Sequence, residues 1–255
     1  MITRAWMMFH LPDMNDFPYM ERFFSRYNAS EIMKRPVSLR YLAYRVAPVP
    51  PGAEDYGYQN YRVHENWAKM EDISGLKGTL SFTPLERHLD FAVAMIPAEP
   101  TEDFLGAGLR YDEKTILRWL IFYKYPEGVS VEEGEKWFLD VHAKEVMQQP
   151  GLIRYFSSST LSMAPMSPPP PWFRHFFTNP SRLAFAKWDR VSEQWYEDAN
   201  GWRKAVLESP PKYTKPDWAK YDKYPFFEPN ADFVSTFILE WPTYNLLRDV
   251  EPRAI

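Results

Sequence analysis

The chain has 255 residues, enough for one large domain or two small ones, and its 45% hydrophobic and 25% charged content is typical of a globular protein. The net charge of −4 provides no basic excess for nucleic-acid binding, and the absence of cysteine excludes disulfides and thiol chemistry. The N-terminal apolar stretch is too short for a signal peptide and no later run approaches the roughly 20 apolar residues of a membrane span, so we expect a cytoplasmic protein that binds neither nucleic acid nor membrane.

The chain repeats itself. The segment from Ile2 aligns without gaps with the segment from Ile116, an offset of 114, and identical or similar residues recur along it. Further on, NWAKMEDIS matches AFAKWDRVS at an offset of 118, and ERHLDFAVAMI matches EPNADFVSTFI at an offset of 142. These matches indicate a tandem duplication. The second copy then carries two insertions, one in the Pro-rich loop SMAPMSPPPPWFRHFF and a longer one in PPKYTKPDWAKYDKYPFF.

Each copy is predicted to run strand, helix, strand, strand, helix, strand. In the second copy the strands are expected at residues 116–124, 152–160, 182–189 and 232–240, and the helices at 131–148 and 191–207. This βαββαβ order predicts an α+β, ferredoxin-like domain with one antiparallel sheet and both helices on one face. Two such sheets in one chain are expected to pack face to face as an intrachain pseudo-dimer that closes into a barrel with a cavity inside.

The predicted halves are residues 1–112, expected to be structural, and residues 113–255, expected to carry the working site. The linker between them is placed at residues 105–114, where glycines interrupt both patterns.

The predicted helix at residues 131–148 carries ionisable residues on its apolar side. At about 100° per residue, Glu145 falls in the middle of the apolar arc and His142 at its edge. The apolar arc is Gly134, Trp137, Phe138 and Val141. In the first copy Glu31 again falls in the middle, and Asn28 replaces the histidine.

Two interpretations of these glutamates stay open. Each carboxylate either holds an arginine, Arg40 or Arg154, in a fixed ion pair beneath the sheet, or is a buried acid with a raised pKa available for proton transfer.

The segment YKYPEGVSVEEGEKWFLDVHAKEVMQQPGLIRY, followed later by KWDRVSEQW, resembles the EthD-like branch of the dimeric α+β barrel superfamily. The resemblance is strongest over residues 116–155. Its most specific features are the helix histidine His142, the turn Pro150-Gly151, and Tyr155 four residues after that glycine. It implies a family of cofactor-independent lyases, cyclases, dehydratases, decarboxylases and muconolactone-type isomerases, with haem-binding relatives elsewhere in the superfamily.

In the methylmuconolactone isomerases of this kind, the active site contains the helix histidine, the strand tyrosine and a second histidine from the loop before the third strand. The resemblance therefore implies catalytic roles for His142, Tyr155 and His175, to which we add Glu145. Lys187 stands where those isomerases have a cysteine. The residues expected to contact substrate are Tyr123, Trp137, Phe138, Trp172 and Lys187.

We expect a cofactor-independent lyase, of decarboxylase or dehydratase type, that applies acid/base chemistry to a small aromatic or conjugated catabolic substrate. The alternatives are an isomerase or polyketide-type cyclase, a haem-dependent dehydratase, and a non-catalytic binding module. No metal-binding motif is present. A homodimer is a further expectation, because the aromatic insertion at residues 213–227 could reach a neighbouring subunit. The alternative is that the insertion covers its own barrel.

Overall fold

The computed structural model describes residues 1–11, 13–34, 36–56, 60, 62–69, 93–106, 116–161, 187–239 and 241–247, without the side chains of Tyr27, Glu31 and Leu247. Two antiparallel sheets form the molecule, as predicted, but each has five strands instead of the four expected. The first has the order β10-β2-β3-β1-β4, and its strands are β1 (Ile2–Phe9), β2 (Ser38–Arg45), β3 (Arg62–Lys69), β4 (Val93–Pro97) and β10 (Tyr244–Leu247). The second has the order β5-β7-β8-β6-β9, and its strands are β5 (Glu102–Leu105), β6 (Leu117–Tyr123), β7 (Arg154–Ser159), β8 (Arg190–Tyr196) and β9 (Phe233–Leu239).

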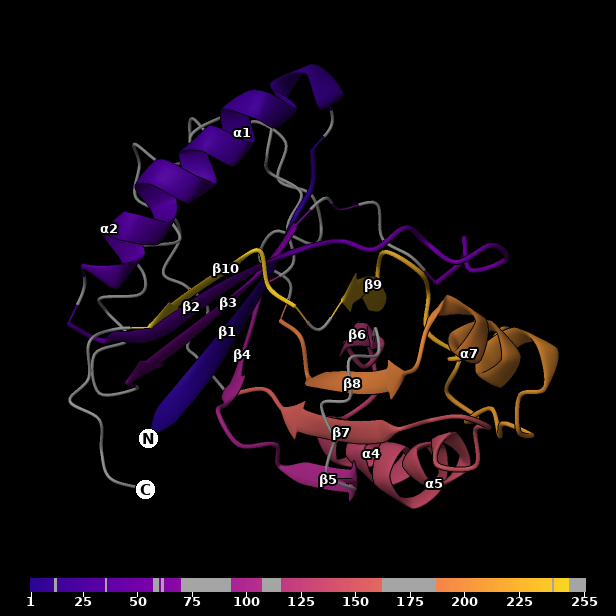
Figure 1. Cartoon of the computed structure of the whole chain (residues 1–255). Helices are drawn as coiled ribbons and strands as arrows, with labels where there is room; N and C mark the ends of the chain where they lie inside the picture. Colours follow the sequence, from indigo (N-terminus) through magenta and orange to yellow (C-terminus); the bar gives the residue numbers. More distant parts are fainter. Residues whose placement is uncertain are drawn as a thin grey trace.

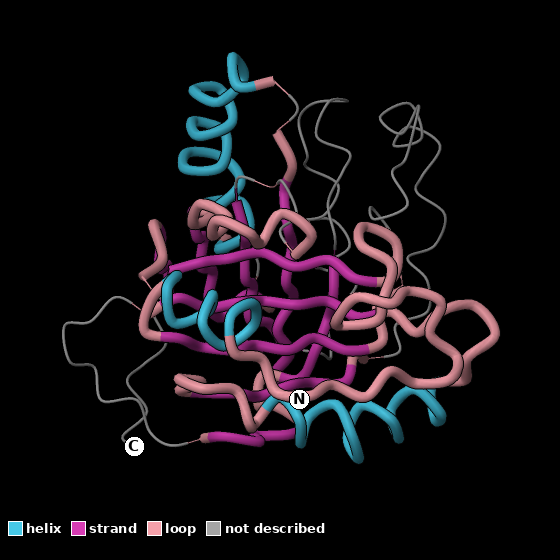
Figure 2. Tube along the Cα trace, turned by 90° about the vertical axis from the view of Figure 1, so that its right-hand side faces the viewer, coloured by secondary structure: helices cyan, strands magenta, loops and turns pink. Residues whose placement is uncertain are grey.

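Helices lie on the outer face of each sheet (Figures 1 and 2). In the first half these are η1 (Met14–Asp16), α1 (Phe17–Phe23), η2 (Phe24–Asn28) and α2 (Ala29–Met33). In the second half they are α4 (Val131–Trp137), η4 (Phe138–His142), α5 (Ala143–Val146), α7 (Ala199–Arg203) and η5 (Lys204–Glu208). None of the helices in the described ranges has the length and apolar character needed to cross a bilayer.

The strand registers confirm the duplication. β1 and β6 occupy equivalent places at the offset of 114, and β4 and β9 at the offset of 142, both as predicted. The match at 118 is wrong, because β3 and β8 superpose at an offset of 128, where RVHENW (residues 62–67) stands on RVSEQW (residues 190–195). The offset thus rises from 114 to 128 and then to 142, so both insertions add 14 residues and neither is the longer.

Correcting this offset also corrects two predicted elements. The strand placed at residues 182–189 is β8, Arg190–Tyr196, and the helix placed at 191–207 begins only at Ala199. The strand was not recognised because it contains polar residues, which the sequence pattern does not mark as buried. Every residue of β8 is in fact buried, including Arg190, Glu193 and Gln194.

The two halves exchange their edge strands. β5 follows the first half along the chain but pairs with β7, and β10 follows the second half but pairs with β2 (Figure 1). The registers are equivalent, since Glu102 pairs with Ser157 as Tyr244 pairs with Ala43. The boundary predicted between residues 112 and 113 lies outside the described residues.

The space between the sheets contains an apolar core to which both halves contribute, with Trp6, Met8 and Val63 on one side and Leu120, Phe122 and Val191 on the other. A cluster of four buried charges lies in the same layer. Arg4 donates to Glu65 (2.7 Å) and to Glu193 (2.9 Å), and Arg118 donates to Glu193 (2.6 Å). Two positive and two negative charges therefore compensate one another across the interface, which fixes how the halves pack.

Candidate functional site

His142 lies between the α4–η4–α5 helix and the outer face of the second sheet, with 1% of its surface exposed. Four aromatic rings surround its imidazole. The ring centroids lie 4.9 Å from it for Phe138, 5.0 Å for Trp137, 5.7 Å for Tyr224 and 5.9 Å for Tyr123. The structure thus brings together His142 and three of the residues predicted to contact substrate.

A π-helical turn decides which residues of this helix face the sheet. The turn covers Phe138–His142, and such a turn takes up about one extra residue, which rotates the following residues by about 100°. His142, predicted at the edge of the apolar arc, is therefore buried, and Glu145, predicted in its middle, is only half-buried. The equivalent helix of the first half has its π turn at Phe24–Asn28, in the same place.

Several buried polar atoms in the layer between the helices and the second sheet have no hydrogen-bond partner among the described residues. They are both imidazole nitrogens of His142, the hydroxyls of Tyr123, Tyr155 and Tyr224, and the side-chain nitrogen of Gln194. Buried polar groups are nearly always paired, and leaving one unpaired costs about 1–3 kcal/mol. So many in one layer are typical of a site that holds a polar ligand.

These groups are uncharged in the folded protein. Burial lowers the pKa of His142 to about 3, and the positive charge of Arg190 adds to this effect. Burial also raises the pKa of Tyr123 and of Tyr224 well above the usual value, so both phenols keep their protons. His142 in the ligand-free protein therefore differs from an unperturbed histidine, whose pKa is near 6.5.

A titration of the ¹⁵N-histidine-labelled chain tests this charge state. We expect His142 to remain neutral as the pH falls from 8 to about 4, because its folded pKa lies below the unfolded value. The free energy of unfolding should therefore fall in acid. The contribution of neutral His142 is complete above about pH 6.5 and is lost at about 1.4 kcal/mol per pH unit as the pH falls toward about 3. An imidazole signal of His142 that titrates near pH 6.5 would contradict the buried placement.

Residues 213–227 fold back over this site on their own half. Tyr213 stacks on Tyr224 with centroids 3.8 Å apart, and Tyr224 stacks on His142. Glu145 anchors this arm, accepting hydrogen bonds from the backbone nitrogen (2.9 Å) and the hydroxyl (2.6 Å) of Thr214. The insertion therefore covers its own barrel, the second of the two roles considered for it.

Both interpretations of Glu145 need revision. The ion pair with Arg154 is not formed, since the Arg154 guanidinium lies over the rings of Phe156 (4.8 Å) and Trp195 (5.5 Å). Glu145 is not enclosed beside His142 either, because its carboxylate is occupied by Thr214. Its observed contacts are those of an anchor for the arm.

Replacing Glu145 with alanine should loosen the arm. A hydrogen bond to a charged group contributes about 1.5–3 kcal/mol, so amide exchange across residues 213–227 should accelerate about tenfold or more. Asp140→Ala is the matched control, because Asp140 is exposed on the same helix and, among the described residues, forms an ion pair with Lys144 and no contact with the arm. Unchanged amide protection of the arm in the Glu145 variant would show that Thr214 does not hold it.

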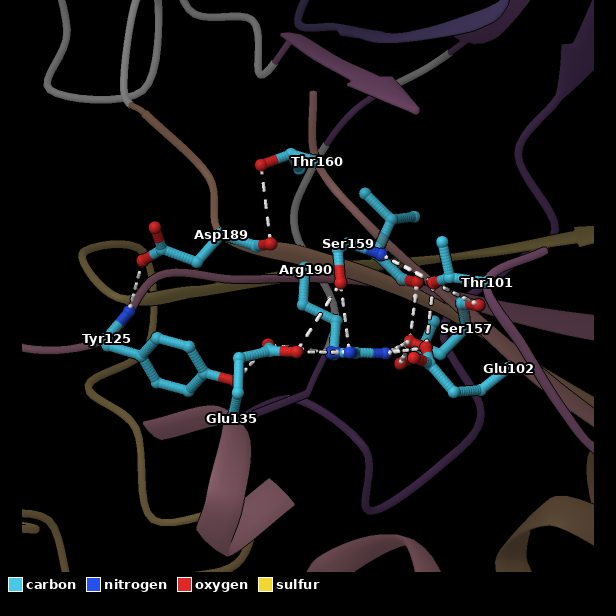
Figure 3. Close-up of polar contacts among 11 residues, drawn as sticks. Thr101, Glu102, Tyr125, Glu135, Ser157, Ser159, Thr160, Asp189 and Arg190 are labelled. Carbon is cyan, nitrogen blue, oxygen red and sulfur yellow. Dashed lines mark hydrogen bonds and ion pairs between the residues drawn. The ribbon is translucent and has the colours of Figure 1, made fainter. Parts of the chain in front are cut away.

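Arg190 on β8 forms a network of polar contacts next to the site (Figure 3). Its guanidinium forms ion pairs with Glu135 and Glu102 and lies 4.6 Å from the Phe138 ring centroid. Tyr125 donates to Glu135 at 2.6 Å. These contacts hold the pKa of Glu135 below its usual value, against the effect of burial, so both charges are kept at neutral pH.

The remaining predicted residues lie apart from His142 or outside the described residues. Tyr155 is fully buried and stacks on Phe104 (4.7 Å), which in turn contacts Phe138. Lys187 is exposed on the loop before β8. His175 and Trp172 fall outside the described residues.

Five residues at the site were not predicted, namely Glu135, Gln149, Arg190, Tyr213 and Tyr224. Gln149 accepts from Tyr196 (2.5 Å) and donates to Tyr213 (2.7 Å), which links the end of the helix to the sheet and the arm. The repeat could have indicated the Glu135–Arg190 ion pair, because both residues recur in the first half. There Glu21 and Arg62 form the equivalent pair at 2.6 Å. No comparable signal marks the tyrosines of the arm, which the first copy lacks.

Comparison with solved structures identifies the architecture. One similar structure is an anthrone oxidase-like protein, 9% identical in sequence, with a TM-score of 0.55 over 100% of this chain and 96% of the other. This chain has the dimeric α+β barrel fold. A chlorite dismutase variant from Candidatus Nitrospira defluvii is 11% identical, with a TM-score of 0.46 over 94% of this chain and 91% of the other. No protein-family model and no curated protein matches the sequence.

Proposed function

We propose that the second half is a small-molecule enzyme in which the neutral imidazole of His142 exchanges a proton with a conjugated aromatic substrate. The supporting observation is the burial of an imidazole whose two nitrogens have no partner among the described residues, beside two protonated phenols, Tyr123 and Tyr224. The rings of Trp137 and Phe138 provide the apolar surface for a flat substrate.

The proposed chemical step is the removal of a proton from an acidic carbon. One nitrogen of His142 takes the proton, the electron pair moves through the conjugated system to the carbonyl oxygen, and the phenol of Tyr123 or Tyr224 donates a hydrogen bond to the resulting enolate. A pKa of about 3 makes His142 a weak base in the empty site. The enolate's negative charge raises that pKa as it develops, so the imidazolium is stabilised where the transition state needs it.

The dehydratase, isomerase and cyclase share this step, since a dehydratase passes through the same enolate and an isomerase or cyclase returns the proton to another atom. A decarboxylase reaches an enolate or carbanion by breaking the bond to carbon dioxide, and the carbon then takes up a proton from solvent. We favour a cofactor-independent lyase of the EthD-like kind, with an isomerase or cyclase as the second candidate. Cytoplasmic location and self-association as a homodimer belong to the same proposal.

Anthrone is a suitable first probe because it is a flat aromatic ketone with an acidic methylene group, and the similar structure of 9% identity is described as anthrone oxidase-like. In deuterium oxide without oxygen, the protein should accelerate exchange of the methylene protons, followed by proton NMR. The panel should include aryl ketones and hydroxybenzoic acids, for which exchange and loss of carbon dioxide are measured. Binding without faster exchange or turnover for any member would favour a non-catalytic binding module.

The described surroundings of His142 do not fit a haem. Both nitrogens of His142 are buried, and a macrocycle beside either one would require the stacked rings of Tyr213 and Tyr224 to leave the imidazole. We therefore derive no step through such a group. A Soret band in the purified protein would contradict this conclusion and revive the haem-dependent alternative.

A further inference from the structure

The first half has a buried histidine of its own at a different place in the same layer. Asn28 stands where the second half has His142, and His64 on β3 stands where β8 has Ser192. The tyrosine is kept, since Tyr41 is equivalent to Tyr155. The histidine has thus moved from the helix to the sheet, and it still lies between the two.

His64 is fully buried and packs among aromatic rings. Its ring centroid lies 4.5 Å from that of Phe9 and 4.5 Å from that of Phe24, and its Nδ1 lies 2.8 Å from the hydroxyl oxygen of Tyr41. Its Nε2 has no hydrogen-bond partner in the part of the chain that the structure describes.

The hydrogen bonds favour one tautomer of His64. The side-chain amide of Asn28 donates to the hydroxyl oxygen of Tyr41 at 3.5 Å, an arrangement in which the hydroxyl proton points to Nδ1 of His64. The imidazole proton is then on Nε2. Because burial and the charge of Arg62 lower the pKa of His64, the ring is neutral and presents one N–H donor.

A matching acceptor lies on the same face of the strand. Asn66 is two residues from His64, so both side chains point toward the helix, roughly 6–7 Å apart along the strand. The side-chain oxygen of Asn66 is buried and, within the described residues, has no partner. The neighbouring charge of Arg62 is already compensated by Glu21 through two contacts of 2.6 Å, so nothing here calls for an anionic ligand.

We propose that this layer of the first half is a second small-molecule site, which takes a neutral hydroxylated aromatic ketone or aldehyde. The carbonyl oxygen accepts from Nε2 of His64, the hydroxyl group donates to the oxygen of Asn66, and the ring lies against Phe9 and Phe24. A single water between His64 and Asn66 would have at most these two polar partners, the low end for ordered buried waters, whereas an aromatic ligand makes both hydrogen bonds and also contacts the rings.

The test is a titration of the full-length, ¹⁵N-histidine-labelled protein with 4-hydroxyacetophenone. The His64 signals are assigned by their loss in the double variant Tyr41→Phe/His64→Leu, which removes both partners of the 2.8 Å hydrogen bond and leaves only the longer 3.5 Å contact of Asn28 without its acceptor. We expect saturable shifts of the His64 nitrogen signals in the wild type. The same shifts are expected in the matched second-half variant Tyr155→Phe/His142→Leu, so the result does not depend on the function proposed for His142.

Two truncated probes test the ligand chemistry. Acetophenone lacks the hydroxyl group and 4-ethylphenol lacks the carbonyl, and each should bind the first half at least tenfold more weakly than 4-hydroxyacetophenone. His64 signals that stay unchanged up to the solubility limit of 4-hydroxyacetophenone would overturn the site. Equal affinity for 4-ethylphenol would overturn the contact with His64, and equal affinity for acetophenone the contact with Asn66.

Discussion

Replacing Glu193 with leucine should lower the free energy of unfolding by about 3–5 kcal/mol, because it leaves the two arginines that Glu193 holds buried without that partner. Glu193 is 1% exposed and accepts from Arg4 of the first half and Arg118 of the second. The loss is measured as a lower midpoint in urea unfolding at neutral pH.

The matched control replaces the whole cluster, as Arg4→Met, Glu65→Leu, Arg118→Met and Glu193→Leu together. Removing all four charges leaves no buried charge uncompensated. The free energy of unfolding of this variant should therefore be close to that of the wild type or higher. A loss below about 1 kcal/mol for Glu193→Leu alone would mean that the cluster is solvated and does not hold the halves together.

The same cluster predicts a direction for acid unfolding. Arg118 and then Arg4 hold the pKa of Glu193 below its usual value although burial opposes them. Its contribution to stability is therefore complete above the unfolded carboxyl pKa, near 4.3, and is lost as the pH falls through the lower folded value.

Replacing His142 with leucine or glutamine should lower the exchange rate of an accepted substrate by about 10²–10⁴, the usual cost of losing a positioned acid/base group. Glutamine should not rescue the rate, because an amide forms hydrogen bonds but does not take up a proton. His10→Gln serves as the control for a histidine outside the site. Near-full activity of both His142 variants, or a larger loss from Asn28→Ala, would show that the working site is not at His142 in the second half.

The choice of these variants follows from burial. With 1% exposure and four rings around the imidazole, alanine at position 142 should leave a cavity and destabilise the protein, as large-to-small substitutions in a core do. Leucine and glutamine keep most of the side-chain volume, so a loss of rate can be separated from unfolding.

Much of the architecture could be predicted because the duplication provides two related sequences for the same fold. β1, β6, β4 and β9 were aligned correctly, since their apolar residues recur at constant offsets. β8 was missed because its polar residues suggested a solvated helix. Their partners are distant in sequence, such as Arg4 for Glu193 and Glu135 for Arg190, and are visible only once the sheet is formed.

The candidate site was harder to predict for a similar reason. His142 and the rings of Tyr123, Trp137 and Phe138 were expected and are brought together. The π turn that buries His142 and turns Glu145 toward the arm has no signature in a 3.6-residue pattern. The arm lies in an insertion, so neither the repeat nor the helix pattern indicated that Tyr224 would stack on His142.

A crystal structure of the full chain soaked with anthrone tests the central claim most directly. The account predicts density for the tricyclic ring between the α4–η4–α5 helix and the second sheet, with its oxygen within hydrogen-bond distance of His142, Tyr123 or Tyr224. Density between the two sheets, or only in the surface groove of about 580 Å³ that includes Lys124, Lys220 and Asp232, would contradict it.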